Sequence, residues 1–366
     1  MKVAIHAQRF KGIAPFVRRY RTILEHNGIA CEEVDSDAPG FVERLGDCDA
    51  FIYRMSHEYN DSERGETLLD LVERECRVKV FPNAATRWSF DDKIRQSYLF
   101  EINNVPHVPT RVFWEKRNAI DWASEQAEYP VVFKLKGGAG STNVVLVRSA
   151  AQARRLIRKM FWRGIRSGAV PGGTYWRDFA LKKLVRTKGG RLVRAIRAGG
   201  VLPVDAVHKD YAFFQEFCPE NDYDTRVTVI GGRAFAFRRF NRKNDFRSSG
   251  SGDIHWDTSA VDLNCVRIAL ETSRKLGFQS MAYDFLYDRD GKAVICECCY
   301  TFDDRAVFNC AGFWDEQLHW HEGHYWPQYW QLVDLLNHRD LRQPEATSGC
   351  GPHGTDARIS TLRRAS

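Results

Sequence analysis

The chain has 366 residues, a formal net charge of +7, 43% hydrophobic residues and 28% charged residues. That length predicts two or three domains, and the composition excludes a collagen, a coiled coil and a wholly disordered chain. No stretch approaches about 18 consecutive apolar residues, so we expect no transmembrane helix. The first residues lack the apolar core and cleavage site of a signal peptide, which favours a cytoplasmic protein with reduced thiols.

The first 85 residues alternate between short apolar runs and amphipathic segments. We expect strands at 2–6, 29–34, 49–54 and 78–81, with helices at 17–27 and 68–74. Such alternation predicts a small parallel α/β domain over residues 1–85. The segment lacks a GxGxxG motif, so it does not predict a dinucleotide site.

A second domain is expected over residues 86–212. It begins with a predicted helix at 91–102, followed by two prolines that flank His107 and Val108. A buried strand at 131–134 then runs into a glycine-rich hairpin tip at 136–141, and a further strand covers 144–147.

The charge is concentrated in one insert of this second domain. Residues 151–200 hold 14 Lys or Arg and one acid, so the insert carries +13 and the rest of the chain carries −6. Arg154, Arg155, Arg158 and Lys159 alternate with apolar residues at the spacing of an amphipathic helix. The segment is either a solvated helix face or a contact for something acidic, such as a phosphorylated substrate or the inner face of an anionic membrane. It lacks the base-stacking aromatics and motifs of a nucleic-acid binder.

A third domain is expected over residues 213–338, with a disordered tail over 339–366. Its predicted strands cover 213–217, 225–230, 233–238, 282–287 and 293–298, and its predicted helix covers 263–276. Gly231-Gly232 and the segment 288–291 read as hairpin turns.

The glycine-rich tip is the first motif with chemical meaning. Small residues such as Gly138, Gly140 and Ser141 let backbone N–H groups approach a polyphosphate, and Lys134 on the preceding strand offers a point charge. Glycine-rich hairpin tips are also common without a ligand.

Two further motifs point to a nucleotide and a metal. The segment Gln215, Glu216 and Phe217 could hold an adenine through backbone groups at a strand edge, although it could equally be a core strand. Asp284 and Glu297 lie on strands joined by a tight turn, and paired carboxylates suit Mg²⁺ with phosphate oxygens. Strand alternation predicts that Glu297 and Cys299 share one face, with Cys296 and Cys298 on the other.

Arginines form the last set. Asp224 and Arg226 lie on one strand, Arg238-Arg239 on the next, and Arg247 precedes a Ser/Gly run. Guanidinium forks suit phosphates and carboxylates, so the set suggests cations around a charged transition state.

In this order, from Lys93 and Lys134 through the Gln215–Phe217 segment to Asp284 and Glu297, the chain resembles the ATP-grasp superfamily over about residues 80–330. The resemblance implies two α+β subdomains that clasp ATP, after a small α/β domain. It implies that Lys93 and Lys134 contact phosphates, with Asp224 also in the nucleotide site, and that Asp284 and Glu297 bind Mg²⁺. Cys299 stands where that family usually has Asn, and a thiol is a poor Mg²⁺ ligand.

The C-terminal third also resembles ATP-grasp proteins of bacterial surface-polysaccharide biosynthesis. His255, Trp256, Asp303 and Arg305 are the candidates for the acceptor pocket. The nearby His319, His321 and His324 could suggest zinc, but the aromatic residues around them favour a substrate platform or a packed loop instead.

The sequence therefore predicts an ATP-dependent carboxylate–amine ligase that works through an acyl phosphate. Arg226, Arg247 and Arg238 are the predicted catalytic cations, ATP and Mg²⁺ the cofactors, and a uronic acid in a glycan precursor the candidate acid. The alternatives are an ATP-dependent kinase and a non-catalytic protein that binds nucleotides or polyanions.

Overall fold

The computed structural model of this chain describes residues 1–7, 14–138, 143–167, 206–242, 245–248 and 250–344. Gly140 and Ser141, most of the basic insert and the tail from residue 345 lie outside the described residues, so these predictions stay predictions.

The N-terminal region is a parallel sheet covered by helices, as its alternating pattern predicted. The strand order is β2-β1-β3-β4, and each neighbouring pair is parallel. Val3, Ala4 and Ile5 on the central strand β1 are all buried, which is typical of a sheet covered on both faces. The elements are β1 (Lys2–His6), α1 (Ala14–His26), β2 (Ala30–Val34), α2 (Phe41–Gly46), β3 (Ala50–Ile52), α3 (Tyr59–Glu75), β4 (Lys79–Phe81) and α4 (Ala84–Arg87).

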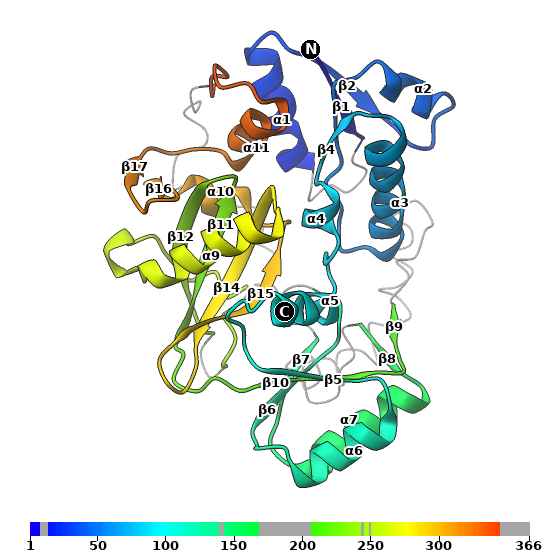
Figure 1. The fold of residues 1–366 in the computed structure, drawn as a ribbon, viewed down its shortest axis with the longest axis vertical. Coiled ribbons are helices and arrows are strands. Elements are labelled where there is room, and N and C mark those ends of the chain that lie inside the picture. Colours follow the sequence, from blue (N-terminus) through cyan, green and yellow to red (C-terminus); the bar gives the residue numbers. More distant parts are fainter. Residues whose placement is uncertain (8–13, 139–142, 168–205, 243–244, 249, 345–366) are drawn as a thin grey trace, which may run out of the picture.

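A helix from the far end of the chain completes this region. Helix α11 (Pro327–Leu336) lies beside α1 (Figure 1) and contributes Leu332, Val333 and Leu336 to the core around β1. The buried hydroxyl of Tyr20 on α1 donates a hydrogen bond to Gln331 of α11. The N-terminal sheet therefore shares its core with residues more than 300 positions away in the sequence.

The middle region is a four-stranded antiparallel sheet with helices on one side, in the order β5-β10-β6-β7. Helix α7 packs through Leu156 and Met160 and leaves Arg155 and Arg158 exposed, which confirms the predicted amphipathic basic helix. The elements are α5 (Lys93–Ile102), β5 (Thr110–Phe113), α6 (Lys116–Glu125), β6 (Val131–Lys134), β7 (Val144–Val147), α7 (Ala150–Trp162), β8 (Ile165–Arg166), β9 (Val207–His208) and β10 (Ala212–Glu216).

The last region is built on a seven-stranded sheet with the path β15-β14-β11-β12-β16-β17 and β13 paired to β12. Gly231 and Gly291 have φ values of 57° and 75° in its hairpin turns, a conformation that favours glycine. The elements are β11 (Tyr223–Ile230), β12 (Arg233–Phe240), β13 (Ile254–His255), the 3₁₀ turn η1 (Thr258–Ala260), α9 (Leu263–Leu276), β14 (Ser280–Tyr287), β15 (Ala293–Cys299), α10 (Asp304–Phe308), β16 (Gly312–Trp314) and β17 (Trp320–Glu322).

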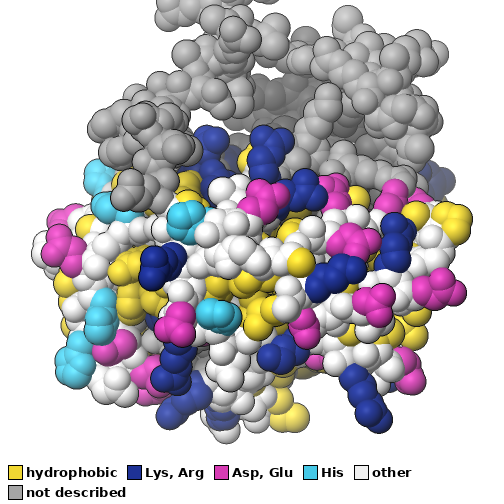
Figure 2. All heavy atoms as spheres, turned by 90° about the horizontal axis from the view of Figure 1, so that it is seen from above, with side chains coloured by type: hydrophobic (Ala, Val, Ile, Leu, Met, Phe, Trp, Pro, Cys, Tyr) yellow, Lys and Arg dark blue, Asp and Glu magenta, His cyan; other side chains and the backbone are white. Residues whose placement is uncertain are grey.

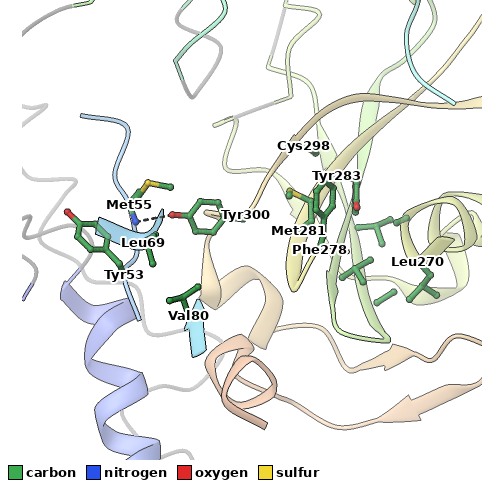
Figure 3. Close-up of a cluster of buried hydrophobic side chains, with 14 of the residues drawn as sticks. Tyr53, Met55, Leu69, Val80, Leu270, Phe278, Met281, Tyr283, Cys298 and Tyr300 are labelled. Atoms are coloured by element: carbon green, nitrogen blue, oxygen red, sulfur yellow. Dashed lines mark hydrogen bonds between the residues drawn. The ribbon is translucent and has the colours of Figure 1, made fainter. Parts of the chain in front are cut away.

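Each face of the seven-stranded sheet has its own core. Helix α9 covers one face, where Val227, Ala236 and Tyr283 belong to a large cluster that continues into the N-terminal region (Figure 3). The other face packs Phe235 and Phe237 against residues of α10 and β16. This second face also forms part of the wall of the cavity described below.

The sheets are stacked along the length of the molecule, with the seven-stranded sheet between the N-terminal and four-stranded sheets (Figure 1). Seen from above, the N-terminal end shows acidic and basic side chains interspersed over its visible surface (Figure 2). Among the described residues, no helix combines the length and hydropathy needed to cross a membrane.

Candidate functional site

A cavity of about 370 Å³ lies between the four-stranded and seven-stranded sheets. One wall comes from β6 and β10, and the opposite wall comes from β11, β14 and β15. Asn241 and residues 245–248, which follow β12, close part of the rim. The predicted site residues that line the cavity are Lys93, Lys134, Gly138, Gln215, Glu216, Phe217, Asp224, Arg247, Asp284 and Glu297.

One end of the cavity is apolar and aromatic. Phe217 and Phe246 meet edge to face with their ring centroids 5.8 Å apart, and Val132 and Leu286 also line the cavity. The expectation of a strand edge at this point was wrong, because β10 is a central strand paired on both sides as far as Glu216. Backbone groups that could bind a flat heteroaromatic ring therefore begin at Phe217, beyond the paired part of β10.

Lys134 lies at the end of β6 with only 5% of its surface exposed. Among the described residues its ammonium has one partner, the thiol of Cys296 at 3.4 Å, and no carboxylate within ion-pair distance. A buried ammonium without a counterion is costly, so this position favours an anion in the cavity.

Lys93 also lines the cavity and, unlike Lys134, is paired with protein groups. Its Nζ lies 3.1 Å from Oε1 of Glu297 and donates a hydrogen bond of 3.0 Å to the carbonyl oxygen of Gly138. Burial alone would lower the pKa of Lys93, but the carboxylates of Glu297 and Asp91 outweigh burial and raise it. Lys93 therefore stays charged and holds the start of the glycine-rich segment beside the metal candidate Glu297.

Asp284 is the centre of a buried network of charges. Arg226 donates to both of its carboxylate oxygens at 2.7 and 2.8 Å, and Arg239 approaches one of them at 2.8 Å. Arg239 also forms a two-bond pair with Asp224, at 2.7 and 2.6 Å. Burial opposes ionisation of Asp284, but the two guanidinium groups hold its pKa well below the usual range.

The structure separates the two neighbouring arginines of β12. Arg239 is on the face of Asp284, whereas Arg238 is on the opposite face, over the rings of Tyr223 and Phe240. Successive side chains of a strand point to opposite faces, so only one of the pair can reach the cavity. The predicted catalytic role of Arg238 is therefore not supported by its position. His255, which is paired with Arg238 in register, is also outside the cavity lining.

The predicted alternation on β15 was wrong at one residue. Cys296 lines the cavity together with Glu297, although adjacent residues were expected to point apart. A β-bulge lies here, because Asp284 pairs with Glu297 while Phe285 pairs with Ile295, which leaves Cys296 as the extra residue. The bulge brings the Cys296 thiol to Lys134, and Cys298 stays in the core as predicted.

Residues that the sequence did not single out lie beside Cys299. Nδ1 of His57 lies 3.3 Å from Oδ1 of Asp91, and its Nε2 lies 3.4 Å from the hydroxyl oxygen of Thr301. Burial would lower the pKa of His57, but hydrogen bonds with Asp91 and Cys299 raise it to about 10. Burial would raise the pKa of Cys299, but its contacts with His57 and Thr301 lower it. No spacing in the sequence brings 57, 91 and 299 together, so the signal was absent.

No protein-family model matches the sequence, and no curated protein matches it. Solved structures do match. A RimK domain ATP-grasp protein from Sphaerobacter thermophilus is 16% identical, with a TM-score of 0.50, and the match covers 84% of this chain and 93% of the other. D-cycloserine synthetase is 15% identical over the same shares of the two chains, with a TM-score of 0.52. Biotin carboxylase from Campylobacter jejuni, in a complex with an ATP derivative, is 12% identical with a TM-score of 0.55, over 91% of this chain and 70% of the other.

The chain has the ATP-grasp fold. The match spans the parallel N-terminal sheet and both sheets that enclose the cavity, as the resemblance in sequence predicted. The individual roles of the residues that line this cavity stay predictions.

The candidates for a substrate pocket do not line the ATP-grasp cavity. Trp256 donates a hydrogen bond to the carbonyl of Ala306 and packs on Phe237 as part of a core. Asp303 caps α10 by accepting from the backbone N–H of Arg305, whose side chain is exposed. These contacts explain the residues structurally, and their role in binding a substrate stays untested.

Two of the carboxylates that line the cavity are the predicted metal donors. Asp284 and Glu297 are directly paired across β14 and β15 and face the same space, which fits one Mg²⁺ completed by phosphate oxygens and water. Cys299 does not fit that role, because its sulfur is soft and engages Thr301 at 3.1 Å. Within the described part of the chain, no group of three or more His, Cys, Asp or Glu side chains is arranged to hold a metal, which includes the region of His319 and His321.

Proposed function

We propose that the protein is an ATP-dependent carboxylate–amine ligase that forms an amide through an acyl phosphate. The observation that carries the proposal is the cavity itself. One end is aromatic, at Phe217 and Phe246. The buried ammonium of Lys134 has no carboxylate partner among the described residues. The carboxylates of Asp284 and Glu297 line the same cavity. Adenine, phosphates and a divalent cation would satisfy these three parts in that order.

The side chains of this chain would position and neutralise charge. Lys134 binds phosphate oxygens as an unpaired cation, and Lys93 joins it when it exchanges part of its contact with Glu297 for phosphate. Arg247 lines the rim of the cavity, is 9% exposed and is bound to Asp245 at 2.6 Å. Its side chain therefore has little conformational freedom to lose when it binds a transferred phosphoryl group. Arg226 and Arg239 keep Asp284 ionised. Bound Mg²⁺, held by Asp284 and Glu297, would neutralise phosphate charge.

The names of matched structures support the reaction class. D-cycloserine synthetase and an N5-carboxyaminoimidazole synthase in complex with ADP both match this fold with TM-scores above 0.5. Because the sequence identities are below 16%, these likenesses give the fold, and the reaction is carried by the cavity.

The experiment is a measurement of Mg-ATP-dependent ADP release with a panel of carboxylic acids, with and without amines. ADP release that needs both an acid and an amine is the expected result, and it should disappear in Glu297→Gln. Glu322→Gln on the exposed strand β17 is the matched control and should keep the rate. ADP release with a stable phosphoester product would show a kinase instead. Absence of Mg-ATP binding would overturn the nucleotide site.

We further propose that the acid is a uronic acid carried on a pyrophosphate-linked or lipid-linked glycan precursor. Support comes from the basic stretch that begins on α7, where Arg155 and Arg158 are exposed and Trp162 beside them is 68% exposed. An exposed aromatic ring among cations suits an anionic carrier or membrane surface. Replacing both arginines by Gln should weaken turnover of a carrier-linked acid and spare a free acid. Equal loss with both substrates would contradict this proposal.

A further inference from the structure

Three side chains from separate parts of the chain meet beside the cavity. Cys299 ends β15, His57 follows β3, and Asp91 precedes α5. The sulfur of Cys299 lies 3.1 Å from the hydroxyl oxygen of Thr301, and that oxygen lies 3.4 Å from Nε2 of His57, so the hydroxyl links the thiol to the imidazole. On the far side of the ring, Nδ1 lies 3.3 Å from Asp91.

Two hydrogen bonds from residues just before His57 hold the arrangement. The backbone N–H of Met55 donates to the hydroxyl of Tyr300 at 3.0 Å, a bond that Figure 3 shows between the N-terminal region and the end of β15. One residue earlier, Arg54 donates to the carbonyl of Phe302 at 3.2 Å. The imidazole therefore belongs to a loop that is fixed against the strand that carries the thiol.

Asp91 fixes the ring from the side of the glycine-rich segment. Its Oδ1 accepts the backbone N–H of Gly138 at 2.7 Å as well as facing His57. An imidazole with a carboxylate at one nitrogen and, at the other, a hydroxyl that leads to the thiol has a defined orientation. This order of groups is the one that activates a cysteine nucleophile.

The thiol lies close to where the proposed acyl phosphate would form. Cys299 is two residues after Glu297, on the same face of β15, so the two side chains are spaced by about 7 Å. Glu297 lines the cavity and binds Lys93. Among the described cysteines, Cys299 alone is linked to an imidazole, through the hydroxyl of Thr301, whereas the adjacent Cys298 is buried in the core.

We propose that Cys299 is a nucleophile that accepts the acyl group from an acyl phosphate, with His57 as the proton acceptor and Asp91 as the residue that positions His57. The proposal rests on the proposed ligase function for its natural substrate, and the class of compound it takes is a carboxylic–phosphoric anhydride.

The step balances without an oxidant or a reductant. The sulfur of Cys299 attacks the carbonyl carbon, a C–S bond forms, the bond from carbon to the phosphate oxygen breaks, and inorganic phosphate leaves. Before the attack, the proton of Cys299 has passed through the hydroxyl of Thr301 to Nε2 of His57, so the attacking group is a thiolate beside a protonated imidazole. An amine then attacks the thioester, the C–N bond forms, the C–S bond breaks, and the sulfur regains a proton.

Acetyl phosphate tests the step without ATP and without the natural acid. The full-length protein should gain one acetyl group in intact mass spectrometry, peptide mapping should place it on Cys299, and neutral hydroxylamine should remove it as it removes thioesters but not acetyl-lysine. His57→Gln should slow this acetylation by roughly 100-fold. Cys299→Ala should abolish it, and Cys76→Ala, at the end of α3, should not change it.

Asp91→Asn tests positioning separately from folding. Acetylation of Cys299 should slow while the thermal unfolding midpoint and the acetylation of surface lysines stay unchanged. A purely structural role for Asp91 would instead lower the unfolding midpoint and leave the rate ratio between Cys299 and lysine unaltered.

The outcomes separate the two proposals. Unmodified Cys299, or acetyl groups spread equally over Cys299 and Cys76 with no effect of His57→Gln, would overturn the thiol proposal. If Cys299→Ala then still releases ADP at the normal rate with an acid and an amine, the ligase proposal stands alone. If Cys299 is acetylated but no acid and amine support ADP release, the ligase proposal fails and the reactive thiol remains.

Discussion

Arg238 and Arg239 are neighbours on β12, and their side chains lie on opposite faces of the seven-stranded sheet. The face toward the cavity carries Arg239, which is 7% exposed and bound to Asp224 and Asp284. The opposite face carries Arg238, which lies over two aromatic rings. The difference teaches that strand register, more than residue type, decides which arginine can act in a site.

The largest expected effect comes from removing the buried arginine of that pair. Arg239→Met leaves Asp224 and Asp284 facing each other without their shared cation, so the free energy of unfolding should fall by about 3–5 kcal/mol. Arg238→Met should cost less than about 1 kcal/mol. Urea unfolding of the two variants measures the contrast, and equal losses would contradict the assignment of faces.

A buried histidine gives the next effect, through pH. Burial and the nearby Lys136 lower the pKa of His208 to about 4, below its value of 6.5 in an unfolded chain. Below pH 6.5 the unfolded state therefore binds more protons than the folded state. The free energy of unfolding is highest above pH 6.5, where His208 is neutral in both states, and it falls as pH falls toward 4. Between about pH 7.5 and pH 5, the free energy of unfolding should therefore fall by about 2 kcal/mol less in His208→Gln than in the unaltered protein.

The exposed His255, on the face away from the cavity, is the matched control for that measurement. His255→Gln should leave the pH dependence of urea unfolding as it is in the unaltered protein. An acid sensitivity that persists in His208→Gln would show that other groups cause it.

The opposing sheet offers a similar contrast for ligand binding. Within the part of the chain that the structure describes, Lys134 is buried without a carboxylate partner, whereas Lys136, two residues later, is 47% exposed in its side chain and lies 3.6 Å from Asp92. Lys134→Met should weaken Mg-ATP binding at least about 10-fold in isothermal titration calorimetry, because a charge-assisted contact to phosphate is lost. Lys136→Met should change the affinity little, and a loss of stability in Lys134→Met would argue against an unneutralised ammonium.

The smallest effect concerns a hydroxyl on the face away from the cavity. Oγ1 of Thr225 is buried and has no hydrogen-bond partner among the described residues. Thr225→Val keeps the shape and removes the buried hydroxyl, so the free energy of unfolding should rise by about 1 kcal/mol. A decrease in the free energy of unfolding, measured with urea, would show that the hydroxyl is hydrogen-bonded in the folded protein.

Local patterns in the sequence were enough for the fold and for the residues that line the cavity. Strand and helix periodicity predicted the parallel N-terminal sheet, and the order of motifs predicted that Lys93, Lys134, Asp284 and Glu297 would share one space. Lys93 and Lys134 lie at the start of a helix and the end of a strand, where topology leaves few alternatives.

Long-range geometry accounts for what the sequence did not reveal. The bulge at Cys296 depends on how two strands are paired, and the choice between Arg238 and Arg239 depends on which face is covered by α9. The meeting of His57 with Cys299 depends on how the N-terminal region docks on β15. None of these leaves a spacing that can be read along the chain.

The position of α11 has a consequence for biosynthesis. The N-terminal sheet ends at Phe81, yet Leu332 and Leu336, which fill its core, are translated about 250 residues later. At roughly 5–20 residues per second, the first domain waits tens of seconds with part of its apolar surface uncovered. Its nascent chain is therefore a client for chaperones, and a stop codon before Pro327 would yield a protein that aggregates although its cavity residues are all present.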